Sequence, residues 1–111
     1  MFIGRLFLRL IGAFLTSMRR SARVDSNQSE IVAALRKRGA VVLITSQLKN
    51  AFDLLVGFNG QLYIVEVKDG NKPPSARKLT LGELKCKEMF ESVGVQYHII
   101  TSVSEAISLI S

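Results

Sequence analysis

The pattern of apolar and polar positions predicts helices and short strands that alternate along most of the chain. Residues 27–38 place Ile31 and Leu35 on one side of a helix, with charged residues on the other sides. Gly39 follows directly and is a typical helix stop. Residues 40–45 then form a continuous apolar run, which is typical of a strand buried in a sheet.

Two further apolar runs, residues 52–56 and 62–68, flank the pair Asn59-Gly60. Asn-Gly between apolar runs is a strong signal of a tight β-hairpin, because both residues accept positive φ. With Asn59 and Gly60 at the centre of the turn, the numbers of paired residues sum to 119. The two runs are therefore expected to pair as antiparallel strands in this register.

Capping patterns mark where the helices are expected to begin, because a short polar side chain precedes Glu or Gln by three positions. The pairs are Asp25 with Gln28, Thr80 with Glu83, and Ser102 with Glu105. The second helix is expected to end near Ser92, ahead of Gly94, and residues 95–101 form another predicted strand. The predicted order is α-β-β-β-α-β-α, an α/β domain with helices on both sides of a central mixed sheet.

Length and composition fit one modest globular domain. The chain has 111 residues, of which 48% are hydrophobic and 22% charged. The single cysteine, Cys86, excludes an internal disulfide and a cysteine-built zinc site, and is typical of a reducing compartment. The net charge of +6 lies entirely in residues 1–38, which hold eight basic and two acidic residues. Such an excess favours a polyanion such as nucleic acid, or a membrane surface.

Residues 1–23 form an apolar and basic arm ahead of the predicted domain, which spans residues 24–111. Its longest uncharged run, Leu10–Met18, has nine residues, far fewer than the ~20 needed to cross a bilayer. The arm is compatible with a targeting segment, an amphipathic surface helix, or an extension upstream of a true start at Met18. The third interpretation is favoured, because the sequence after Met18 is typical of the start of a globular domain.

Two charged residues, Glu66 and Lys68, interrupt the predicted strand in the stretch "IVEVKDG". The hairpin register places Asp53 directly opposite Glu66, and strand alternation places Lys68 on the same face. Two carboxylates held this close repel each other, so they need a counter-charge. A bound divalent cation is favoured, because two nearby carboxylates are a typical protein share of a Mg²⁺ site. The alternative is a salt bridge between Glu66 and Lys68 on a solvated face.

Asp53 followed by Glu66-x-Lys68 on the neighbouring strand resembles the signature of the PD-(D/E)XK nuclease superfamily. The chain is similar to small phage-type nucleases of the VRR-NUC and Holliday-junction-resolvase kind. The similar segments are "DSNQSEIVAALRKRGA", "FDLLVG", "IVEVKDG", "PPSARKLTLGE" and "SVSEAISLI". This resemblance implies a restriction-endonuclease-like α-β-β-β-α-β core. One position departs from the pattern, since Phe52 stands where a proline often precedes the aspartate.

The resemblance also implies roles for individual residues. Asp53 and Glu66 would ligate Mg²⁺, or Mn²⁺ in its place, together with the backbone carbonyl of Val67. Lys68 would orient or help deprotonate the attacking water and offset negative charge on the phosphate. Glu30, on the first helix, matches an additional acidic residue that some members bring to the metal. Phosphodiester hydrolysis needs this chemistry, because a metal activates water and, with a nearby lysine, stabilises charge on the phosphoryl oxygens.

Basic residues near the predicted site are candidates for DNA contacts. Lys72, Arg77 and Lys78 belong to a loop with glycine and prolines that follows the strand carrying Glu66. Contact with DNA phosphates and a merely solvated loop are equally good interpretations of these three. Arg36 lies in the last turn of the first helix, where a cation also complements the helix dipole, so DNA contact is a second use for it.

The predicted function is a Mg²⁺-dependent DNA endonuclease, a phosphodiester hydrolase acting on branched or structured DNA in the cytoplasm of a bacterium or a phage-infected host. Symmetric cutting of two strands by a domain with one site requires a homodimer. Neither a small-molecule cofactor nor membrane contact is expected. Two alternatives remain open: an inactive nucleic-acid-binding module on the same fold, and a membrane-associated protein that acts through residues 1–23.

Overall fold

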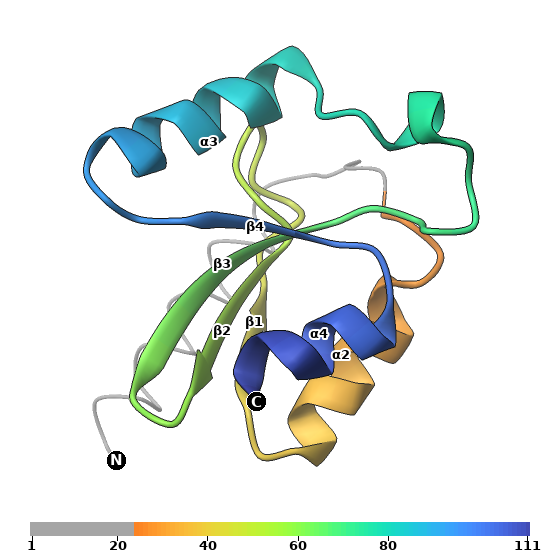
Figure 1. Cartoon of the computed structure of the whole chain (residues 1–111), viewed down its shortest axis with the longest axis vertical. Coiled ribbons are helices and arrows are strands. Elements are labelled where there is room, and N and C mark those ends of the chain that lie inside the picture. The colour runs from red at the N-terminus through yellow and green to blue at the C-terminus, as the bar shows by residue number, and fades with distance from the viewer. Residues whose placement is uncertain (1–23) are drawn as a thin grey trace.

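The computed structural model describes residues 24–111 and shows the predicted order of helices and strands (Figure 1). A short 3₁₀ helix is added in the loop before α3. The elements are α2 (Gln28–Lys37), β1 (Val41–Ile44), β2 (Leu54–Phe58), β3 (Gln61–Val67), η1 (Pro74–Arg77), α3 (Leu81–Ser92), β4 (Tyr97–Ile100) and α4 (Val103–Ile110). The arm predicted for residues 1–23 lies outside the described residues. Among those described, no helix combines the length and the apolar character needed to cross a membrane.

The β2–β3 hairpin has the predicted turn and the predicted register. Asn59 and Gly60 both have positive φ, at 51° and 79°, as the two central residues of a tight hairpin turn require. Leu54 pairs with Val65, and every other pair in the hairpin keeps the same register. The expected start of β2 at residue 52 is wrong, since the strand begins at Leu54.

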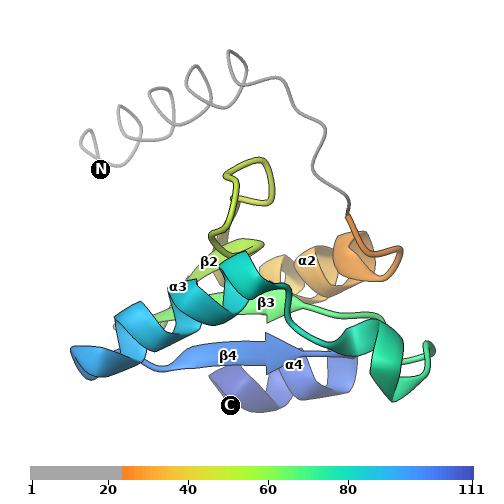
Figure 2. The same ribbon diagram turned by 90° about the horizontal axis from the view of Figure 1, so that it is seen from above.

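The sheet has four strands in the order β1-β2-β3-β4. The first three are antiparallel, and β4 runs parallel to β3, so the sheet is mixed as predicted. Helices α2 and α4 cover one face and α3 lies over the other (Figures 1 and 2). Because α3 crosses above β3 and β4, its first turn approaches the end of β3 that carries the charged residues.

The main core lies between the sheet and the α2/α4 layer. Its largest fully buried side chains are Ile31, Leu35, Leu54, Val56, Val65 and Val67. Burial of each such side chain contributes about 1.5–3 kcal/mol to folding. A smaller cluster on the opposite face joins Ile64, Cys86 and Tyr97 under α3. The apolar positions of β3 therefore secure the strand from both sides, which holds its polar positions rigidly.

Two of the three predicted helix caps are confirmed. The Thr80 hydroxyl accepts the Glu83 N–H in a complete capping box, and the Ser102 hydroxyl accepts the Glu105 N–H. The predicted Asp25–Gln28 box is wrong, because Asn27 is the N-cap residue of α2 and makes no side-chain cap. Its amide instead donates to backbone carbonyls at the ends of β3 and β4, at 3.1 Å each, and so ties the helix to the sheet.

Candidate active site

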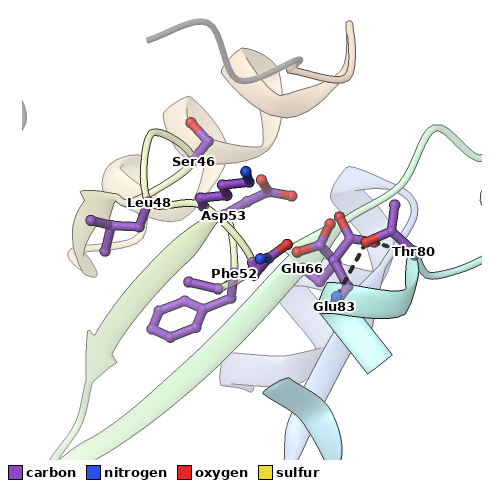
Figure 3. A pocket seen from close by; sticks show the side chains of 10 residues that line it. Ser46, Leu48, Phe52, Asp53, Glu66, Thr80 and Glu83 are labelled. Carbon is purple, nitrogen blue, oxygen red and sulfur yellow. Dashed lines mark hydrogen bonds between the residues drawn. The ribbon is translucent and has the colours of Figure 1, made fainter. Parts of the chain in front are cut away.

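A hollow of about 220 Å³ opens where the β1–β2 loop, β3 and the start of α3 meet (Figure 3). Ser46 and Leu48 form one wall, and Glu66, Thr80 and Glu83 lie on the opposite wall, with Asp53 between them. The full lining is Ser46, Leu48, Lys49, Asn50, Ala51, Phe52, Asp53, Glu66, Thr80 and Glu83. Three carboxyl groups therefore converge on one small space beside the sheet.

Asp53 enters this hollow because the chain rejoins the sheet just before β2. The paired register ends at Leu54 and Val65, and the N–H of Asp53 donates to the carbonyl of the same Val65 at 3.0 Å, which keeps Asp53 at the edge of β3. Its carboxylate oxygen Oδ2 accepts the Val67 N–H at 2.8 Å. Burial raises the pKa of Asp53 above its ordinary value, although the hydrogen bond from Val67 opposes this change.

Glu66 is a buried carboxyl group on the α3 face of β3, only 3% exposed. Burial, followed by the negative charges of Asp53 and Glu83, raises the pKa of Glu66 to about 9. Without a cation, Glu66 is therefore protonated at neutral pH. The crowding of carboxylates expected from the register is present, and Lys68 alone does not relieve it.

Lys68 points into the same cluster but is bound mainly by a residue of α3. Its ammonium nitrogen lies 2.8 Å from Glu83 Oε1 and 3.6 Å from Glu66 Oε2. Burial favours the neutral amine, but the hydrogen bond and charge of Glu83 outweigh this effect and raise the pKa of Lys68. The amine is therefore held as an ammonium ion.

Glu83 is a site residue that sequence reasoning underestimated, because its place in a capping box accounts for it without any further role. The same oxygen, Oε1, accepts both the Thr80 N–H at 2.9 Å and the Lys68 ammonium. Although burial alone would raise it, these hydrogen bonds lower the pKa of Glu83, so it is ionised. Only the docking of α3 over β3 reveals this second partner.

The β1–β2 loop that carries one wall is braced at several points. Thr45 donates its hydroxyl to the carbonyl of Phe52 at 2.7 Å, and Tyr97 donates to the carbonyl of Ala51 at 3.1 Å. The Asn50 side chain packs against Gly82 in the first turn of α3, where a Cβ atom would overlap it. The loop is therefore fastened to the sheet and to α3, and Asp53 follows directly from it.

The donor set fits a divalent cation. Asp53 and Glu66 are both desolvated carboxyl groups whose pKa values lie above normal, and a cation between them would favour their ionised forms. Lys68 cannot replace that cation, since its closest partner is Glu83. Across residues 24–111, no three His, Cys, Asp or Glu side chains are arranged to hold a metal together. The protein would thus provide two carboxylate ligands, a number that suits Mg²⁺, because this ion keeps several of its waters when bound.

The structure does not bring Glu30 to this hollow. Glu30 lines a second hollow on the other side of the β3 end, with Asp69, Asn71 and the start of α4. Its proposed place at the metal therefore has no support from the arrangement and stays a prediction. The N–H of Val67 donates to Asp53, so Val67 lies beside the site. The role of its carbonyl as a metal ligand stays a prediction.

The basic residues predicted to contact DNA lie outside the hollow. Lys72 is about half exposed and lies 3.6 Å from Asp25, while Arg77 closes η1 and Lys78 follows it. Arg36 donates to the carbonyl of Val42 at 2.8 Å, so it has a structural partner between α2 and β1. Lys72, Arg77 and Lys78 remain candidates for phosphate contact. For Arg36, a structural role in joining α2 to β1 is favoured over DNA contact.

Of three comparisons with known proteins, one finds a match, and it bears on the fold. No protein-family model matches the sequence, and no curated protein matches it. A solved structure described as a "VRR_NUC domain" does match, with a TM-score of 0.57 and 26% sequence identity. The match covers 78% of this chain and 96% of that one. The fold expected from the sequence is thereby confirmed, and the chain has the α/β fold of VRR-NUC domains, a PD-(D/E)XK-like nuclease fold.

Proposed function

We propose that this protein is a metal-dependent endonuclease that hydrolyses phosphodiester bonds in DNA. The observation that carries the proposal is the convergence of Asp53 and Glu66 in one hollow, with the ammonium group of Lys68 beside them. The nuclease fold, matched over 78% of the chain, supports the same conclusion. Fold alone does not establish chemistry, so the proposal rests on the site.

The two carboxylates would hold a divalent cation, Mg²⁺ or Mn²⁺, with the carbonyl of Val67 as a further ligand. Such an ion, when bound, supplies an acidified water and neutralises charge on phosphoryl oxygens. Asp53 is oriented for this role by the Val67 N–H, which donates to one of its oxygens. Glu66 would contribute from the facing strand.

Lys68 would act as a fixed positive charge and hydrogen-bond donor toward the scissile phosphate. Because Glu83 keeps it protonated, the ammonium group is suited to orient water and to stabilise charge that develops in the transition state. It is poorly suited to accept a proton. Of the roles expected for this lysine, orientation of the water and charge stabilisation are favoured over deprotonation of the water.

We further propose branched or structured DNA as the substrate, on the resemblance of the sequence to junction-cutting nucleases. One domain carries one site, so paired cuts in two strands would be made by a homodimer. The single cysteine supports a reducing compartment such as the cytoplasm.

A cleavage assay on the full chain tests the proposal. End-labelled linear, nicked, flapped and four-way-junction DNA would be incubated with Mg²⁺ or with a chelator. We expect Mg²⁺-dependent cleavage that is fastest on the branched substrates, and about a 100-fold or larger loss in Asp53→Asn and Lys68→Met. Glu88→Gln, which changes an exposed acid on α3, is the matched control and should cut normally. Binding of branched DNA with no cleavage in any metal would identify an inactive binding module instead.

A further inference from the structure

Tyr97, the first residue of β4, contacts the candidate site, although no pattern in the sequence places it there. Its ring is 3% exposed and packs in the small cluster with Ile64 and Cys86 under α3. Its hydroxyl lies 3.2 Å from Glu66 Oε1 and 3.1 Å from the carbonyl oxygen of Ala51. The phenol therefore reaches from β4 to both segments that carry the two carboxylates, since Ala51 lies two residues before Asp53.

The parallel pairing of β3 with β4 explains this reach. Ile64 is the register partner of Tyr97, and Glu66 is the partner of Ile99, so Tyr97 and Glu66 are diagonal neighbours on one face. Diagonal neighbours lie about 7–8 Å apart at the backbone, a distance that an aromatic side chain spans. A shorter side chain at position 97 would leave Glu66 Oε1 without this partner.

The contact also divides the two oxygens of Glu66 between different partners. Oε1 faces the phenol of Tyr97, and Oε2 faces the ammonium group of Lys68 at 3.6 Å. A carboxyl group with a partner on each oxygen is fixed in rotation about its last bond. The same hydroxyl also lies beside the backbone that leads into Asp53, although its single proton serves only one of these two acceptors at a time.

We propose that Tyr97 is a positioning residue for the metal site. It holds the Glu66 carboxyl group in its orientation toward the hollow that Asp53 also lines. This inference rests on the proposed function, since it assumes that Asp53 and Glu66 are the ligands. Groups that orient metal ligands in this way typically raise metal affinity 10–100-fold.

Mn²⁺ binding to the full chain tests the proposal without any DNA, with free Mn²⁺ measured by electron paramagnetic resonance. Tyr97→Phe removes the hydroxyl and keeps the ring in its cluster. Tyr63→Phe is the matched control, because it makes the same change at the other tyrosine, which stacks edge-on against His98. Tyr63 packs against the core on the opposite face of the sheet. Circular dichroism and thermal melting of each variant report the fold.

We expect Tyr97→Phe to raise the Mn²⁺ dissociation constant about tenfold, and Tyr63→Phe to change it less than about twofold. Cleavage by Tyr97→Phe should fall at limiting Mn²⁺ and recover when Mn²⁺ is in excess, which a loss of folding would not allow. A lower melting temperature with an unchanged dissociation constant would show that the hydroxyl serves only packing, and would overturn this inference alone. A wild-type protein that binds no Mn²⁺ would overturn both the inference and the proposed function.

Discussion

Glu66 occupies a strand position that would hold an apolar side chain in most buried sheets. Its burial and its two acidic neighbours raise its pKa to about 9, so the metal-free protein keeps it protonated. That Glu66 lies close to Asp53 could be predicted from sequence, because Asn59 and Gly60 fix the hairpin register, although the paired strands end at Leu54 and Val65. The partner of Lys68 could not, since Glu83 has a sufficient local role as a capping residue and meets Lys68 only through tertiary packing.

The raised pKa of Glu66 predicts how the stability of the metal-free protein depends on pH. The folded state retains a proton on Glu66 up to about pH 9, whereas the unfolded chain loses it near the ordinary value of 4.5. At Glu66 the folded state thus binds more protons between these values, so the contribution of Glu66 to stability is fully present below the lower value and is lost as pH rises toward 9. Glu66→Gln should show a shallower decline, because an amide does not titrate.

Urea denaturation with a chelator present, at several pH values from 5 to 9, measures this effect. Glu88→Gln is the control for loss of one exposed carboxylate. Parallel pH profiles for wild type and Glu66→Gln would mean that the environment of Glu66 does not favour its protonated form.

At the scale of elements, turn and cap chemistry made most of the chain predictable. The hairpin, α3 and α4 follow from residues that act locally, at Asn59-Gly60, Thr80 and Ser102. The start of α2 was predicted to within one residue, but its cap was not: the N-cap residue is Asn27, whose amide makes tertiary bonds to the ends of β3 and β4 in place of a local cap. The β1–β2 loop has no repeating pattern, so its bracing against α3 could not be read from sequence.

Gly82 provides a test of that bracing. Gly82→Ala would place a methyl group where the Asn50 side chain lies, and should displace the loop that forms one wall of the hollow. The greater helix propensity of alanine, worth about 1 kcal/mol, should offset much of the destabilisation, so the melting temperature is expected to change little. Amide hydrogen exchange in residues 46–52 should become faster, and cleavage should become slower.

The double variant Asn50→Gly/Gly82→Ala is the control, because it removes the side chain that the new methyl group meets. Glycine also suits the positive φ of 57° at position 50. If Gly82→Ala leaves hydrogen exchange in the loop unchanged, the contact does not brace the loop.

At the scale of the whole molecule, strand order decides which residues meet. The sequence predicts a mixed sheet, but a pattern of apolar positions does not say that β4 lies beside β3 and brings Tyr97 to Glu66. It also does not reveal that Glu30 faces a different hollow from Asp53. The family resemblance identified Asp53, Glu66 and Lys68. Their partners Glu83 on α3 and Tyr97 on β4 are recognised only from the three-dimensional structure.

The loop after β3 carries the three basic residues that are candidates for DNA contact. If Lys72, Arg77 and Lys78 bind phosphates, the triple alanine variant should bind all DNA sequences more weakly. The dependence of log K on log salt should flatten by about one unit for each phosphate that is no longer neutralised. Lys85→Ala, on the exposed side of α3, controls for the removal of a positive charge elsewhere. An unchanged salt slope in the triple variant would leave these residues as a solvated loop.

The most direct test of the metal site is the melting temperature of the full chain with and without Mn²⁺. An ion that binds only the folded state stabilises it by mass action, so Mn²⁺ should raise the melting temperature of the wild type. Glu66→Gln should abolish the rise, whereas Lys68→Met should keep much of it, because the lysine is assigned to the phosphate and not to the metal. A wild-type protein whose melting temperature is indifferent to Mn²⁺ would contradict the account and leave only the nuclease fold.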